Sequence, residues 1–162
     1  MNRLSFTIDC ECLHLTLVYQ ESDGCPEPST NINCALAEMI DVIPFNTTGD
    51  TSFVPGIGFG PATQCYGIEA ESSTVWYEMA AVTERTCYRA TVVFEDYGYG
   101  TLATYKGTSC SNLTCWYDFE GGDTASAYFD VTPGERSFIV VADRPYDTKG
   151  PFSLEVDVSI AP

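Results

Sequence analysis

Apolar and polar residues alternate along most of the chain with the two-residue period of β-strands. The clearest segment is FSLEVDVSI, residues 152–160, in which the even-numbered positions are apolar and the odd-numbered positions are polar. Because successive side chains of a strand point to opposite faces, this pattern predicts a half-buried antiparallel strand. ASAYFDV, residues 125–131, alternates in the same way and places Ala127, Phe129 and Val131 on one side.

Four further segments have the composition of strands. RSFIVVA, residues 136–142, is apolar on both faces, which is typical of a central strand. VWYEMAAV (75–82), CYRATVVF (87–94) and TLATY (101–105) are separated by short polar connections. Only ALAEMI, residues 35–40, has a helical composition, and it is long enough for less than about two turns.

The connections between these segments are turns rather than helices. Thr132-Pro133-Gly134 separates two predicted strands, and Pro followed by Gly suits the two central positions of a type II turn. Many short strands separated by Gly, Pro and Asp predict an all-β fold, specifically an antiparallel β-sandwich of the jelly-roll type.

The N-terminal part of the chain has a different pattern. Residues 4–12 and 13–19 alternate with opposite parity, which indicates a bulge or a crossing between two packing surfaces. A polar, proline-containing connector, ESDGCPEPSTN, follows at residues 21–31. We therefore expect residues 1–31 to form an extended arm and connector, and residues 32–162 to form the main sandwich domain.

The charge of the chain excludes several classes of partner. The 23 acidic residues outnumber the 7 basic ones and give a net charge of −16, which repels nucleic-acid backbones and anionic membranes. Hydrophobic residues make up 44% of the chain, which is too many for a disordered protein. An acidic surface either keeps the protein in solution or attracts cations and positively charged partners.

Neither a membrane span nor a signal peptide is expected. No stretch is long and apolar enough to cross a bilayer, so membrane insertion is excluded. Asp9, Glu11 and His14 interrupt the apolar core that a secretory signal peptide needs. We therefore expect the chain to be a mature or excised piece of a protein.

The cysteine content predicts an extracellular protein, secreted or on the cell surface. The chain has eight cysteines, an even number, and no CxxC motif with partners at zinc spacing. Such a set is typical of disulfides formed in an oxidising compartment. The sequons Asn46-Thr47-Thr48 and Asn112-Leu113-Thr114 point the same way and predict glycosylation at both asparagines.

The pairing of the cysteines is only partly predictable. Cys110 and Cys115 enclose four residues, and we expect them to form a structural disulfide worth about 2 kcal/mol. A reactive redox pair is the alternative, but it needs an electropositive setting and this neighbourhood is acidic. Cys34 and Cys65 are the next expected pair. The unassigned cysteines are Cys10, Cys12, Cys25 and Cys87, and Cys10 or Cys12 is a candidate for a bridge to another chain.

From Ile32 onward, the order of features resembles the bacterial pre-peptidase C-terminal domain family. The matching pieces include Asn33-Cys34-Ala35, Val75-Trp76-Tyr77, Leu102-Ala103-Thr104-Tyr105 and the closing Gly150-Pro151-Phe152, within residues 32–160. The resemblance implies a jelly-roll-like sandwich that accompanies secreted enzymes or surface proteins. Some members bind Ca²⁺, and some bind insoluble polymers such as collagen or polysaccharide.

One acidic run is a candidate calcium site. Asp118, Glu120 and Asp123 offer the hard oxygen ligands that Ca²⁺ prefers, although their spacing is not that of an EF-hand. Glu95-Asp96 and residues 143–147 are candidates for further ligands. The chain departs from the family here, because Trp116 and Tyr117 precede Asp118 where relatives often carry consecutive acidic residues. The alternative is a solvated acidic turn, and no cofactor is otherwise indicated.

Catalysis has little support in the sequence. His14 is the one histidine of the chain, so no Ser-His or Cys-His arrangement is identifiable and no catalytic residue is assigned. Paired carboxylates are plentiful, which leaves a glycosidase open by inventory alone. We expect a protein that is not an enzyme.

Aromatic residues at predicted loops are the candidate ligand contacts. Tyr97, Tyr99, Trp116 and Tyr117 are placed there, where exposed rings stack on sugar faces or act as packing lids. Trp76 lies within a predicted strand and is assigned to the core.

Two functional hypotheses follow. The first is a structural or assembly module of an extracellular matrix, sheath or filament, whose partner is another copy of itself. The apolar N-terminal strand would add to a neighbour's sheet in such an assembly. The alternative is a carbohydrate- or polymer-binding accessory module of a secreted protein.

Overall fold

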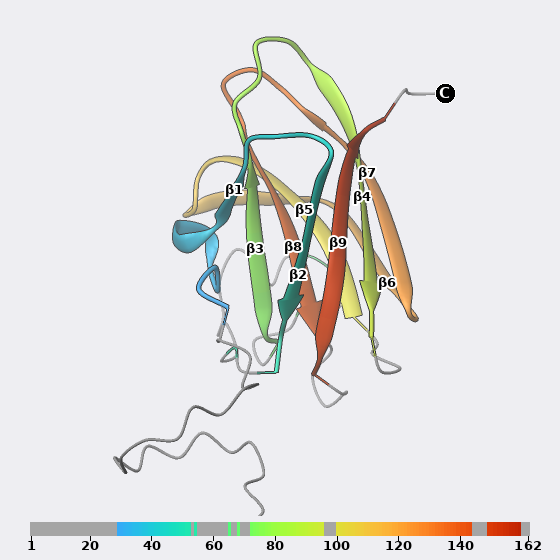
Figure 1. Ribbon diagram of the computed structural model, residues 1–162. Coiled ribbons are helices and arrows are strands. Elements are labelled where there is room, and N and C mark those ends of the chain that lie inside the picture. Colours follow the sequence, from blue (N-terminus) through green and yellow to red (C-terminus); the bar gives the residue numbers. More distant parts are fainter. Residues whose placement is uncertain are drawn as a thin grey trace, which may run out of the picture.

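A computed structural model describes residues 29–52, 54, 65, 68, 72–95, 100–143 and 149–159 (Figure 1). Most of this part is β-strand, and its one helical element is a single 3₁₀ turn. The elements are the 3₁₀ helix η1 (Cys34–Leu36) and the strands β1 (Glu38–Ile40), β2 (Phe45–Asp50), β3 (Thr74–Met79), β4 (Thr86–Phe94), β5 (Gly100–Ser109), β6 (Asn112–Gly121), β7 (Thr124–Val131), β8 (Arg136–Asp143) and β9 (Pro151–Val158). No helix of this part is long and apolar enough to cross a membrane.

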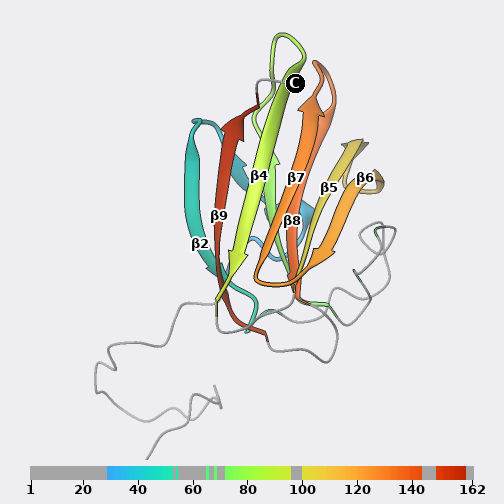
Figure 2. The ribbon, with the colours of Figure 1, turned by 90° about the vertical axis from the view of Figure 1, so that its right-hand side faces the viewer.

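The strands form two sheets packed face to face (Figures 1 and 2). The five-stranded sheet has the order β1-β3-β8-β5-β6, and the four-stranded sheet has the order β2-β9-β4-β7. All neighbouring strands are antiparallel except β1 and β3, which are parallel. The predicted all-β sandwich is confirmed.

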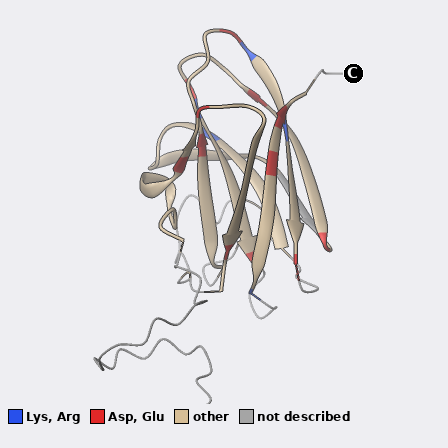
Figure 3. Cartoon of the chain, viewed as in Figure 1, with Lys and Arg blue, Asp and Glu red and all other residues tan. Residues whose placement is uncertain are grey.

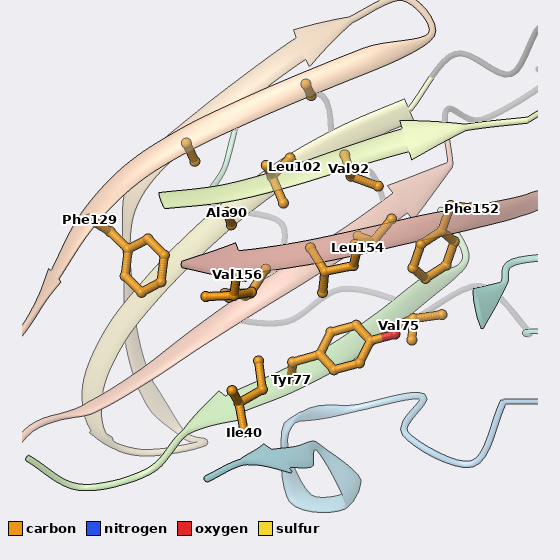
Figure 4. Close-up of a cluster of buried hydrophobic side chains, with 14 of the residues drawn as sticks. Ile40, Val75, Tyr77, Ala90, Val92, Leu102, Phe129, Phe152, Leu154 and Val156 are labelled. Carbon is orange, nitrogen blue, oxygen red and sulfur yellow. The ribbon is translucent and has the colours of Figure 1, made fainter. Parts of the chain in front are cut away.

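The main core lies between the two sheets, as the alternation predicts. The even-numbered side chains are buried in residues 88–94 of β4 and in residues 152–156 of β9, and the odd-numbered ones are buried in β7. Figure 4 shows these side chains meeting Leu102 of β5 and Tyr77 of β3, both of which are fully buried. Burial of such side chains contributes roughly 1.5–3 kcal/mol each, which makes this layer the main source of stability.

A second apolar cluster covers the outer face of the five-stranded sheet. Trp76, Tyr105 and Phe138 lie at its centre, with the indole ring centre 5.6 Å from that of Tyr105 and 6.1 Å from that of Phe138. Strands β5 and β8 carry apolar residues on both faces, so both faces need cover. Cys34 of η1 and the buried Cys65 belong to this cluster.

Two disulfides join these covering residues to the β5–β6 hairpin. Cys34 bonds Cys110, and Cys65 bonds Cys115. The predicted pairs Cys110–Cys115 and Cys34–Cys65 are therefore wrong, although all four residues are in disulfides. The physical reason is that residues 112–121 continue as strand β6 instead of closing a small loop. Cys115 lies opposite Tyr105 in that ladder, where it faces the cluster and meets Cys65.

Local predictions from the sequence had mixed outcomes. The type II turn is confirmed, because Gly134 has φ of 83° and the Glu135 amide donates to Thr132 O at 3.1 Å. The helical prediction for residues 35–40 is wrong beyond Leu36, since residues 38–40 pair with β3 as strand β1. The backbone pairing with β3 satisfies more groups than a short helix would.

Several predictions fall outside the described residues. These are the arm over residues 1–28, with His14, Cys10, Cys12 and Cys25, and the loop residues Asp96, Tyr97 and Tyr99. Asn31, at the end of the expected connector, is buried and hydrogen-bonds both ways with the Trp76 backbone. The domain boundary at residues 31–32 stays a prediction. Cys87 pairs with no other cysteine of the described part.

Removing either disulfide is expected to lower the stability of the fold by a measurable amount. Cys34–Cys110 closes a separation of 76 residues and Cys65–Cys115 one of 50. Replacing either pair by serine is expected to lower the free energy of unfolding by about 4 kcal/mol in the chain-entropy model. Urea unfolding measures this loss. Peptide mapping without reduction that recovers a Cys110–Cys115 bridge would contradict the arrangement.

Asp143 at the end of β8 predicts a pH dependence. Its Oδ1 accepts from the Ser73 amide, and its Oδ2 lies 3.8 Å from Lys149 Nζ. Burial raises the pKa of this carboxyl from 3.8 to about 6, despite these partners. Because the folded pKa is raised, the carboxyl favours the fold below about pH 4 and loses that contribution as pH rises through 6.

We therefore expect Asp143→Asn to match the wild type near pH 4 and to exceed its stability near pH 7.5. The expected gain is up to about 3 kcal/mol, which corresponds to two pKa units. Urea midpoints at the two pH values measure it, with Glu155→Gln as the control on an exposed strand position. If Asp143→Asn lost the same stability at both pH values, the raised pKa of Asp143 would be contradicted.

Candidate functional site

A broad groove lies at one end of the four-stranded sheet, near the start of β4 and the end of β9, and is lined by outward residues such as Arg89 and by inward ones such as Tyr88. It has a volume of about 1190 Å³. Side chains of β4, β7 and β9 line it, together with Ile43 and Pro44 before β2 and Trp116 of β6. Figure 2 shows this sheet with β5 and β6 beyond β7, and β6 contacts β7.

The strand alternation that builds the core also places the groove residues. Tyr88 and Phe129 point inward and stack, so Arg89 of β4 and Tyr128 of β7 face outward. In the ladder Arg89 lies opposite Tyr128 on one side and opposite Asp157 of β9 on the other. A row of Asp157, Arg89 and Tyr128 therefore runs across three neighbouring strands.

Trp116 reaches this groove from the other sheet because of a β-bulge. Thr104 lies opposite Tyr117 and Tyr105 opposite Cys115, so Trp116 is an extra residue with no partner in the ladder. A bulge bends its strand and redirects the side chain at that point. The Trp116 residue is 57% exposed, although it is one of the largest apolar side chains in the protein.

An ion-pair network holds the indole ring. Lys106 Nζ lies 4.2 Å from the centre of the Trp116 ring, within the range of a cation–π interaction. The same Nζ donates to Asp130 Oδ1 at 2.7 Å, and Arg85 Nε donates to Asp130 Oδ2 at 2.9 Å. The side chains of Lys106 and Asp130 are each 12% exposed, so this contact is well shielded from water.

The network also fixes the charge of Asp130. Its burial raises the pKa of the carboxyl, but hydrogen bonds and charge from Lys106 and Arg85 outweigh burial and hold the pKa below its usual value. Asp130 is therefore ionised at neutral pH and serves as an anchor for two cations rather than as a proton donor.

Of the two predicted ligand-contact residues that the structure describes, one lines the groove. Trp116 lines it, whereas Tyr117 is 39% exposed and lies outside the lining. Sequence reasoning missed Tyr128, Arg89 and Asp157. The signal was present for Tyr128, because a large aromatic residue occupies a position on the polar side of the alternating segment 125–131. Their proximity to Trp116 was not readable, since it depends on how the sheets pack.

The candidate calcium ligands do not form a turn as expected. Asp118 and Glu120 lie within strand β6, opposite Ala103 and Thr101 of β5, and Asp123 is exposed just before β7. The expected acidic loop is thus a strand, which the aromatic residues around it favour. Among the described residues no group of three or more potential metal ligands occurs. Calcium binding stays a prediction.

Both sequon asparagines lie at exposed positions. Asn46 is on β2, an edge strand of the four-stranded sheet, and Asn112 begins β6. A bulky glycan fits only at such a surface position of the fold, so both sites remain candidates for glycosylation.

No protein-family model matches the chain, and no curated protein matches it. Solved structures similar to it include the pre-peptidase C-terminal domain of a collagenase from Bacillus anthracis, with 16% identity and a TM-score of 0.46, covering 75% of this chain and 94% of that one. This domain is from the family that the sequence was found to resemble.

Two other similar structures have different roles. One is a mitogen derived from Yersinia pseudotuberculosis, with 13% identity and a TM-score of 0.45, covering 74% of this chain and 91% of that one. Another is PliG of Aeromonas hydrophila, a periplasmic inhibitor of g-type lysozyme, with 11% identity and a TM-score of 0.42, covering 76% of this chain and 96% of that one.

The ion-pair network yields a prediction about the motion of Trp116. Replacing Lys106 by methionine keeps the length of the side chain but removes the charge that contacts both the ring and Asp130. We expect the Trp116 ring to become more mobile, measured as a lower NMR order parameter of its side chain. Lys149→Met, remote from the groove, is the control. An unchanged order parameter in Lys106→Met would show that the bulge alone fixes the ring.

Proposed function

We propose that this protein is a non-catalytic extracellular module that binds a carbohydrate polymer in the groove, with Trp116 as the main contact. The observation that carries the proposal is an exposed tryptophan whose ring contacts Lys106, which is itself bonded to Asp130. Its apolar ring contributes nothing to either apolar core, because it belongs to neither cluster.

Stacking of a sugar on the flat indole ring would explain why Trp116 lies on the surface instead of in a core. The apolar face of a sugar ring can lie against an indole or phenol ring, and Tyr128 offers a second ring that is 59% exposed. A ring held in place before binding loses less conformational entropy when the ligand arrives. The contact of Trp116 with Lys106 therefore favours a binding role.

The chemistry of the groove supports a role other than catalysis. A general acid of a glycosidase needs a carboxyl with a raised pKa, whereas the pKa of Asp130 is lowered. The described carboxyl with a raised pKa is Asp143, which does not line the groove. The groove thus offers surfaces for stacking and hydrogen bonding, and its Asp130 serves as an ion-pair anchor rather than as a proton donor.

An extracellular location is supported by the two disulfides, which persist in oxidising compartments. The assembly hypothesis depends on residues 1–28, which lie outside the described part of the chain. It stays a prediction, and no described contact favours it over the binding module.

Binding to insoluble polysaccharides tests the proposal. We expect the full chain to co-sediment with at least one member of a panel of cellulose, chitin, mannan, xylan and insoluble polygalacturonic acid. Trp116→Ala is expected to weaken that binding about tenfold or more, since it removes the stacking surface. Tyr117→Ala is the matched control, because this neighbouring aromatic lies outside the groove.

The proposal fails if no polysaccharide of the panel binds. It fails equally if Trp116→Ala and Tyr117→Ala bind as well as the wild type, because the groove would then not be the contact surface.

A further inference from the structure

We infer that the groove takes an uncharged glycan chain lying across strands β9, β4 and β7 towards Trp116, and that it discriminates against acidic glycans. This inference rests on the proposed function and names the class of ligand, its direction and the residues that select it. Four features carry it: the order of the outward side chains, the unpaired hydrogen-bonding groups, the charge of the groove, and the position of the exposed rings.

The direction follows from the ladder. Asp157, Arg89 and Tyr128 lie directly opposite one another on three adjacent strands, and β6 with Trp116 contacts β7 beyond them. Neighbouring strands are about 4.8 Å apart, so the row from β9 to β7 is about 10 Å long. A ligand that touches all these groups must lie across the strands. A ligand lying along β4 would meet Thr91 and Val93 instead, which border a separate hollow.

Arg89 differs from the other cations of the described residues. Arg85, Lys106, Arg136 and Lys149 each lie within 4.0 Å of a carboxylate oxygen. Arg89 has no such contact among the described residues, although acidic residues outnumber basic ones in this chain; its Nε donates to Thr91 Oγ1 at 3.2 Å. Part of its guanidinium donor set therefore faces the groove.

Asp157 supplies the complementary acceptor. It lies beside Arg89 in the ladder and lines the groove, and no described cation lies within ion-pair distance of it. A guanidinium and a carboxylate side by side offer fixed donors and acceptors at once. Neighbouring hydroxyl groups of a sugar ring, which donate and accept hydrogen bonds, match such a pair.

The balanced charges of the groove suit an uncharged ligand, and the charge of the whole chain disfavours an acidic one. Its described lining holds two carboxylates, Asp130 and Asp157, and two cations, Arg85 and Arg89, so the positive and negative charges balance. Asp130 already binds Arg85 and the neighbouring Lys106. Figure 3 shows how few basic residues the sandwich carries, and the whole chain has a net charge of −16. A polyuronate or sulfated chain would meet repulsion from the molecule and from Asp157.

The exposed rings lie at one end of the row. Tyr128 and Trp116 are both more than half exposed, whereas the β9 end offers Asp157 and Val158. The hydrogen-bonding pair and the stacking surfaces are thus consecutive along the row, which suits successive sugar units of one chain.

Isothermal titration calorimetry of the full chain tests the inference. The probes are soluble oligosaccharides: cello-, manno- and xylo-hexaose as neutral chains, and hexagalacturonate as the acidic chain. We expect at least one neutral hexaose to bind about tenfold or more tightly than hexagalacturonate. Arg89→Met and Asp157→Asn are each expected to weaken that binding about tenfold, because each removes or alters one half of the donor–acceptor pair.

Glu155→Gln is the matched control for Asp157→Asn. It is the next outward acidic residue on β9, is exposed, and lies outside the groove. We expect it to bind as the wild type does. All of these side chains are on the outer face, so the sandwich core is unchanged, and circular dichroism of each variant checks the fold.

The outcomes separate this inference from the proposed function. Binding of hexagalacturonate in preference to every neutral hexaose, with loss in Trp116→Ala, would overturn the inference and leave the proposed function standing. Wild-type affinity in both Arg89→Met and Asp157→Asn, with loss in Trp116→Ala, would overturn the crosswise arrangement. If Trp116→Ala binds as the wild type does, the proposed function itself is wrong.

Discussion

Strands β5 and β8 are apolar on both faces, and the rest of the structure depends on how both faces are covered. The four-stranded sheet covers the inner face and forms the main core. The outer face is covered by residues that include Cys34 and Cys65, which are held by two disulfides to the β5–β6 hairpin. Short, irregular segments gain little from their own backbone order, so covalent bonds are an effective way to keep them in place.

The same two disulfides stabilise the start of strand β6, which carries Trp116 of the candidate binding site. Cys110 and Cys115 lie on either side of the start of β6, and Trp116 directly follows Cys115. Three features restrain Trp116: the β-bulge at its own position, the disulfide of its neighbour Cys115, and the contact of its ring with Lys106. A site on strands fixed in this way is positioned more accurately than one on a free loop.

The site itself combines residues that lie far apart in the sequence. The row of Asp157, Arg89 and Tyr128 comes from three strands, and Trp116 joins them from the second sheet. Alternation makes Tyr128 point outward, and this was readable from residues 125–131 alone. That Arg89 lies opposite both Tyr128 and Asp157 depends on the register and on the order of strands, which no local pattern specifies.

The sequence by itself determined the all-β class, the positions of most strands, the turn at Pro133-Gly134 and the use of cysteines as bridges. These features follow from local chemistry: side-chain alternation, the backbone freedom of glycine and the oxidation of thiols in pairs. Only the tertiary structure decided which cysteines pair, that residues 112–121 form a strand, and that Trp116 shares a groove with Arg89 and Tyr128. Each of these depends on which distant segments pack against the second face of the sheet, and that choice is made by the free energy of the whole fold.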